Sequence, residues 1–194
     1  MAMLLVDAPA REPLTVAEAK LHLRLDTDDD DALIASLIGA ARMHLERLLG
    51  RAFISQTWLE TRDCWPSHSA PVLLARAPVQ DIVEVRIVDR EGSATVLPEE
   101  DYFLDAVSAP SRLARLASGV WPPPGRGING IEIEFVAGFG DDVDDVPAPL
   151  RQALLMLVCD WYETRQPVDF SSAVSALPAA VAGLVAPWRL RMFG

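Results

Sequence analysis

Residues 31–51 read DALIASLIGAARMHLERLLGR, and this stretch predicts an amphipathic helix. Its apolar side chains recur every three or four residues, the spacing that places them on one helical face. They are Ile34, Leu37, Ile38, Ala41, Leu45 and Leu48. The charged side chains fall mostly on the other face: Arg42, Glu46 and Arg47. Gly50 suits the left-handed conformation that ends many helices, so we expect a helix over residues 31–49.

Two further amphipathic helices are predicted nearer the ends of the chain. The first would cover residues 15–25, because Thr15 and Glu18 form a capping-box pattern in which each residue satisfies the backbone of the other. The other would cover residues 150–165 and bury one stripe of side chains: Leu150, Leu154, Leu157, Val158 and Trp161. These segments predict a small bundle of three main helices.

Between the second and third helices the apolar spacing changes to the alternation typical of strands. The change comes at Arg51 and reverses near Pro147. Seven short segments are suited to strands: residues 53–62, 72–74, 82–88, 95–97, 102–104, 112–116 and 131–136. In the third of these segments, one face would carry Val83, Val85 and Ile87. We therefore predict an α+β fold in which residues 53–136 form a β-rich antiparallel insert.

The last part of the chain differs in composition from the rest. Residues 173–187 carry no charge and contain two prolines and a glycine, and the chain then ends in WRLRMFG. We expect a main domain over residues 1–165, followed by an extended C-terminal arm over residues 166–194. Such an arm either folds back on its own core or docks into a partner with aromatic and arginine side chains as anchors. The residues alone favour both interpretations equally.

The overall charge bears on the possible partners. The chain has 28 acidic and 17 basic side chains among 194 residues, and its formal net charge is −11. A free-standing nucleic-acid binder needs a basic surface that displaces counterions from phosphate, so the composition argues against this class. No apolar stretch reaches the roughly 18 residues that span a bilayer, and the first ten residues lack the basic flank of a secretory signal. We expect a soluble, cytosolic chain without membrane contact.

Two motif matches fail in their context. Residues 125–130 (GRGING) match GxGxxG, but a dinucleotide site needs a strand before the glycines and a helix after them. Here prolines precede the glycines and a predicted strand follows them. Residues 26–37 begin like a calcium loop, but aspartate and leucine replace the glycine and the glutamate that the loop requires. We interpret this acidic run as a solvated helix cap.

The remaining reactive side chains give no support for catalysis. The three histidines are not spaced to form a metal-binding helix face: His22, His44 and His68. Cys64 and Cys159 are far apart in the sequence and indicate neither a disulfide framework nor a zinc site. We therefore expect no enzyme activity, no catalytic residue, no metal and no cofactor.

Three segments, taken in order, resemble the head–tail connector (adaptor) proteins of long-tailed phages, which have relatives in prophages and gene transfer agents. The first segment is PLTxxEAKxHLR at residues 13–24, followed by Asp29 and Asp30. The second is LIxAA from Leu37, continuing to Gly50-Arg51. The third is PLRxALL from Pro149, continuing through Trp161-Tyr162 to Arg165. The resemblance covers about residues 10–165 and the Trp188-Arg189 ending, and the insert here is larger than in the minimal all-helical members.

The resemblance implies a structural, non-enzymatic protein that forms a ring, usually of twelve copies, in the neck of a virion or particle after assembly in the bacterial cytoplasm. Its partners would be itself, the portal protein and the stopper or tail-completion protein. DNA would pass through the channel without specific binding, and an acidic wall would repel its phosphates. In relatives the C-terminal segment reaches the portal, which implies these candidates for portal docking: Leu184, Trp188, Arg189, Leu190, Arg191, Met192 and Phe193.

Two other classes of function stay open on the residues alone. One is a non-catalytic regulatory or scaffold protein that binds a partner through the C-terminal tail. The other is an enzyme with a site at the junction of the insert and the helices.

Overall fold

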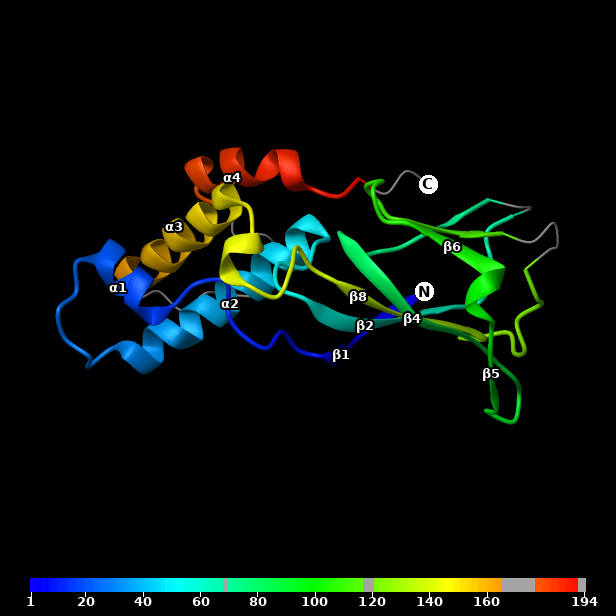
Figure 1. Ribbon diagram of the computed structural model, residues 1–194. Coiled ribbons are helices and arrows are strands. Elements are labelled where there is room, and N and C mark those ends of the chain that lie inside the picture. The colour runs from blue at the N-terminus through cyan, green and yellow to red at the C-terminus, as the bar shows by residue number, and fades with distance from the viewer. Residues whose placement is uncertain (68–69, 117–120, 165–176, 192–194) are drawn as a thin grey trace. The chain divides into compact units, whose positions relative to one another are not determined.

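The computed structural model describes residues 1–67, 70–116, 121–164 and 177–191. The chain divides into two compact units (Figure 1). The helical unit contains residues 11–54 and 140–189, and the sheet unit contains residues 1–10, 55–139 and 190–194. The fold is α+β with antiparallel sheets, as the sequence predicts.

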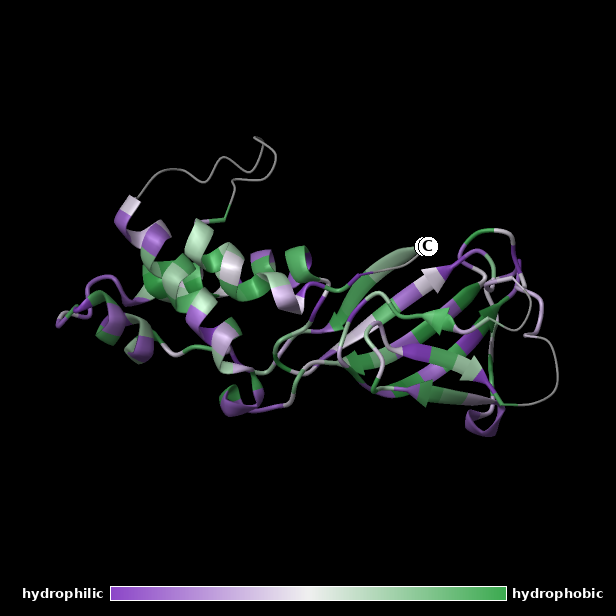
Figure 2. Ribbon diagram, turned by 90° about the horizontal axis from the view of Figure 1, so that it is seen from above, coloured by the Kyte–Doolittle hydropathy of each residue, from purple (hydrophilic) through white to green (hydrophobic). Residues whose placement is uncertain are grey.

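Among its described residues, the helical unit has four α-helices, where the sequence predicts three main ones. They are α1 (Val16–Leu23), α2 (Asp31–Leu49), α3 (Ala148–Thr164) and α4 (Ala179–Val185). Helix α2 packs against α3, α1 contacts both of them, and α4 packs on α3. Figure 2 shows hydrophobic residues gathered where these helices meet. The fully buried side chains of this core include Ile34, Ile38, Leu45, Leu150, Leu154 and Leu157.

The helix ends follow from the capping residues. Thr15 Oγ1 accepts a hydrogen bond from the backbone N–H of Glu18 at 3.1 Å, and the backbone N–H of Thr15 donates to Glu18 Oε2 at 2.8 Å. This is the capping box that the sequence predicts. Helix α2 ends at Gly50, whose φ of 68° lies in the left-handed region that glycine adopts without steric cost.

Two charged residues of α2 are buried, which corrects the expectation that they lie on the exposed face. Arg42 Nε and Nη2 donate to the two carboxylate oxygens of Glu12 at 2.7 and 3.1 Å, and Nη1 donates to Glu46 Oε2 at 2.9 Å. Glu46 Oε1 accepts from the backbone N–H of Phe53 at 2.8 Å. The network therefore ties the segment before α1 and the segment after α2 to the middle of α2. Burial alone would lower the pKa of Arg42, but the two carboxylates outweigh it and raise the pKa.

The described strands of the sheet unit form two antiparallel sheets. The larger has the strand order β1-β2-β8-β4-β5, with β1 at Ala2–Asp7, β2 at Gln56–Arg62, β8 at Ile131–Ala137, β4 at Val79–Val88 and β5 at Ala94–Val96. The smaller has the order β3-β7-β6, with β3 at Val72–Leu73, β7 at Arg112–Arg115 and β6 at Tyr102–Asp105. The part of the chain that the structure describes also has three short 3-10 helices: η1 (Glu99–Asp101), η2 (Val143–Asp145) and η3 (Ala186–Trp188).

The strands follow the predicted alternation in β8 but not in β4. In β8, Ile131, Ile133 and Phe135 are all fully buried on one face, as predicted. In β4 the register against β8 shifts twice, between Val79 and Asp81 and between Ile82 and Glu84. The predicted face was therefore wrong: Ile82, Val85 and Val88 are buried, and Val83 is exposed.

Two parts of the larger sheet differ from the sequence prediction. Strand β1 was not predicted, and it pairs antiparallel with β2 so that Leu4 lies opposite Leu59. Phe53 and Ile54, which were expected in a strand, are buried in the helical unit instead. Ile54 forms an isolated parallel bridge with Gly140, at the points where the chain leaves and re-enters the helical unit. Gly140 suits this position, because a Cβ atom would lie 2.6 Å from the Cβ atom of Asp145, a contact that rotation of the Asp145 side chain cannot relieve.

The predicted C-terminal arm is only partly described. Residues 165–176 and 192–194 lie outside the described residues. Residues 177–191 include α4 and η3 rather than an extended chain, which corrects that part of the prediction. Val181 and Val185 are buried, because they are four residues apart and share the face of α4 that packs on α3.

Candidate interaction surfaces

The C-terminal segment is attached to the helical unit at two places. The first is the α4 face that buries Val181 and Val185. The second is Arg51, which follows α2: its Nε donates a hydrogen bond to the carbonyl oxygen of Trp188, and its guanidinium carbon lies 6.0 Å from the centre of the Trp188 ring. Burial lowers the pKa of Arg51. The described residues from α4 to Trp188 are therefore anchored to the core of the helical unit.

The predicted docking residues fall on both sides of this anchor. Leu184 and Trp188 are half-buried, and Trp188 contacts Arg51. Arg189 and Arg191 are exposed, and Leu190 between them is half-buried. Met192 and Phe193 lie outside the described residues. The role of Arg51 was missed, because its partner is 137 positions away and no local pattern shows it.

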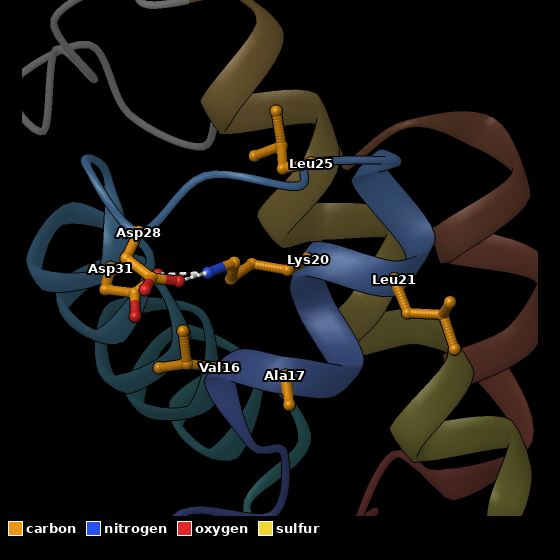
Figure 3. A pocket seen from close by; sticks show the side chains of 7 residues that line it. All are labelled: Val16, Ala17, Lys20, Leu21, Leu25, Asp28 and Asp31. Carbon is orange, nitrogen blue, oxygen red and sulfur yellow. Dashed lines mark hydrogen bonds and ion pairs between the residues drawn. The ribbon is translucent and has the colours of Figure 1, made fainter.

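The acidic turn between α1 and α2 borders an open pocket of about 560 Å³ (Figure 3). Its lining consists of Val16, Ala17, Lys20, Leu21, Leu25, Asp28 and Asp31. Lys20 Nζ lies 2.5 Å from Asp28 Oδ1 and 2.8 Å from Asp31 Oδ1. The hydrogen bonds that Lys20 Nζ donates to these two carboxylates raise the pKa of Lys20, and the bond from Lys20 lowers the pKa of Asp28. The ammonium group thus occupies the place a cation would take between these aspartates, and Asp30 accepts a hydrogen bond from the hydroxyl of Tyr162.

The glycine-rich loop at residues 125–130 has a packing role. A Cβ atom on Gly125 would lie 2.4 Å from the carbonyl oxygen of Val88, so glycine is needed for the close approach of the loop to β4. The backbone N–H of Asn129 donates to Asp63 Oδ1 at 2.8 Å, and Arg126 Nε donates to the carbonyl oxygen of Asn129 at 3.0 Å. Strand β8 follows the loop. The loop therefore lacks the helix N-terminus that a dinucleotide site uses.

Neither a metal centre nor a membrane segment is found in the described parts of the chain. Within residues 1–67, 70–116, 121–164 and 177–191, no three His, Cys, Asp or Glu side chains are grouped to hold a metal ion. Over the same residues, no helix is both long enough and apolar enough to cross a bilayer.

One face of the larger sheet carries a cluster of charges at its centre. Arg86 on β4 forms ion pairs with three carboxylates: Glu84 beside it, Glu132 at 3.1 Å and Glu134 at 3.3 Å. Three negative charges surround one positive charge, so the centre of this face is acidic. The two edges of the same sheet carry exposed apolar side chains, which are Leu4, Leu5 and Val6 on β1 and Val96 on β5.

Solved structures of one kind of particle match the whole chain. A chain in the virion of a native gene transfer agent (GTA) particle is 30% identical, with a TM-score of 0.82 over 100% of this chain and 98% of that one. A chain in the neck of an empty GTA particle, computed with C6 symmetry, is 31% identical with the same TM-score and coverage. A chain in the neck of a native GTA particle, computed with C12 symmetry, is 29% identical with a TM-score of 0.79 over the same coverage.

The profile of the phage gp6-like head-tail connector protein family matches residues 13–85. The chain belongs to this head–tail connector family. No curated protein sequence gave a significant match. The family match begins at Pro13, so it includes the capped helix α1 and the whole of α2 with Arg42 and Glu46, whereas Glu12 of the same network lies one residue before it. The resemblance stated from the sequence is therefore confirmed, and the chain is a structural connector of the kind found in GTA particle necks.

Proposed function

We propose that this connector forms a ring, of twelve copies, in the neck of a phage or gene-transfer-agent particle. The observation that carries the proposal is the full-length likeness to chains of GTA necks, one of them computed with C12 symmetry. A ring of twelve copies is the simplest assembly with that symmetry. The ring joins the portal to the stopper and tail, and it assembles in the bacterial cytoplasm before it becomes part of the particle.

The role of the connector is structural and non-enzymatic. DNA passes through the channel of the ring without being bound specifically. The net charge of −11 supports this, because an acidic wall repels phosphate and gives DNA no counterions to displace. The anchored geometry of α4 and η3 supports portal docking by the residues that follow them, since Arg189 is exposed directly after a firmly held segment.

The test of portal docking is a truncation that removes residues 189–194 and leaves α4 and the Arg51–Trp188 contact in place. We expect the truncated protein to keep its thermal stability and to lose co-assembly with the portal protein of the same particle, as seen by electron microscopy of the mixture. A matched pair of charge reversals separates docking from general charge: Arg189→Glu with Arg191→Glu should weaken co-assembly, and Arg24→Glu with Arg47→Glu, exposed in the helical unit, should not. Truncated protein that joins portal at wild-type occupancy would place the docking surface elsewhere.

A further inference from the structure

The two edge strands of the five-stranded sheet carry exposed apolar side chains, which is unusual for strands with a free edge. Strand β1 forms one edge and β5 the other, and each has a single strand neighbour in the described structure (Figure 1). The exposed fractions are 57% for Leu4, 45% for Leu5 and 47% for Val6 on β1, and 53% for Val96 on β5. Free edges in soluble proteins commonly carry a charged side chain that prevents pairing with another chain. Residues 2–6 of β1 and residues 92–98 around β5 carry none, and the charged side chain on these two strands is Asp7, at the end of β1.

The charge distribution restricts what can cover these edges. Each copy of the chain has a formal charge of −11, so two copies repel each other wherever charged surfaces meet. The carboxylates that pair with Arg86 lie at the centre of the sheet's face, on β4 and β8, and the acidic side chain on an edge strand is Asp7, the last residue of β1. Contact between β5 and the uncharged residues 2–6 of β1 therefore brings copies of an acidic chain together with little repulsion.

The pairing register shows how the two edges would align. Ala2 lies opposite Thr61, Thr61 opposite Glu132, Glu132 opposite Arg86, and Arg86 opposite Val96. These residues form one row across the sheet, so Ala2 and Val96 lie at the same height on opposite edges. Each strand is antiparallel to the next, so β1 and β5, first and fifth in order, run in the same direction.

A ring needs an interface made from two different surfaces of each copy, one on either side. The two edges of one sheet meet this requirement. A rotation of a sixth or a twelfth of a turn, as in the related necks, cannot reverse the direction of a strand. We propose that β1 of one copy pairs in parallel with β5 of the next copy, so that the sheet continues from copy to copy around the ring. This inference rests on the proposed ring and names the surface that closes it.

The first test places charges on both edges. Leu4→Glu combined with Val96→Glu puts two negative side chains at every copy-to-copy contact, and we expect this variant to lose the ring. Leu4→Lys combined with Val96→Glu replaces the repulsion by attraction, and we expect the ring to return. The matched control is Phe103→Glu with Val107→Glu, two exposed apolar residues of the smaller-sheet hairpin, which should leave the ring intact. Ring content is measured by mass photometry and negative-stain microscopy, with the protein alone and mixed with portal, and folding by circular dichroism.

The second test is a cross-link in a Cys64→Ser background, because Cys64 is exposed. Leu4→Cys with Val96→Cys should give a ladder of covalent multimers with a short bis-maleimide reagent, whereas Leu4→Cys with Val107→Cys should not. If wild-type rings form but the doubly acidic variant still assembles and the ladder is absent, the edge pairing is overturned and the proposed function stands. If the wild-type protein forms no ring, either alone or mixed with portal, both the edge pairing and the proposed ring are overturned.

Discussion

Replacement of Arg42 by methionine tests whether the buried charge network holds the helical unit together. The substitution keeps most of the side chain's apolar volume and removes three hydrogen bonds to Glu12 and Glu46. The Glu12 side chain is 35% exposed and can be rehydrated, but that of Glu46 is only 6% exposed. Removing one partner of a buried ion pair typically costs about 3–5 kcal/mol. Glu46 keeps its hydrogen bond from Phe53, and Glu12 regains water. We therefore expect the free energy of unfolding to fall by ~3 kcal/mol, the lower end of that range.

The measurement is the free energy of unfolding from urea titration at neutral pH, followed by circular dichroism. The control is Arg47→Met on the same helix, where the side chain is exposed and the change should stay within about 0.5 kcal/mol. A further variant replaces Arg42, Glu46 and Glu12 together by apolar residues of similar size, and it should recover much of the loss because no charge is left buried without a partner. A loss for Arg42→Met no larger than for Arg47→Met would refute this account of the network.

Three other predictions follow from local geometry. Thr15→Ala removes the cap of α1 and should cost about 1 kcal/mol in urea titration, and an unchanged midpoint would contradict the role of the capping box. Val181→Asp puts a charge where α4 packs on α3, so limited proteolysis should cut residues 177–191 faster than in Ala180→Asp, whose side chain is exposed. Hydrogen bonds from Ser108 and Arg112 lower the pKa of Asp105 to about 2. The order that Asp105 gives the β6–β7 loop is therefore complete above its ordinary pKa of 3.8 and is lost as the pH falls through about 2, which amide exchange at Val107 would report.

The helices could be predicted because their signals are local. The apolar spacing over residues 31–49 and the Thr15–Glu18 pair depend on neighbours within one or two turns, and both are found as predicted. The same reasoning failed for Arg42 and Glu46. Periodicity treats every charged residue as exposed, whereas their burial depends on Glu12, 30 residues upstream of Arg42, and on the backbone of Phe53.

The strands show a similar limit. Strand β1 is exposed on nearly its whole length, so its sequence has no alternation between buried and exposed residues, and its partner β2 begins about fifty residues later. The register shifts of β4 are set by its pairing with β8, which the residues of β4 alone cannot show. Helix α4 lies in the segment expected to be an extended arm, because Pro178 and Pro187 flank it and Gly183 within it weakens a helix. The packing of Val181 and Val185 on α3 overrides that weakness. The docking residues remain a prediction.

The bridge between Ile54 and Gly140 has a consequence for how such a chain can change over time. Because these two residues are neighbours, residues 55–139 form a segment whose two ends lie side by side. Lengthening such a segment costs little entropy, since the cost of closing a loop rises only with the logarithm of its length. Insertions and deletions in the loops of residues 55–139 can therefore leave α1 to α4 in place, provided that β2 stays as the partner of β1. A connector built this way can acquire new contacts in one module while the other is inherited unchanged, and a foreign domain with adjacent termini could be spliced in at the same point.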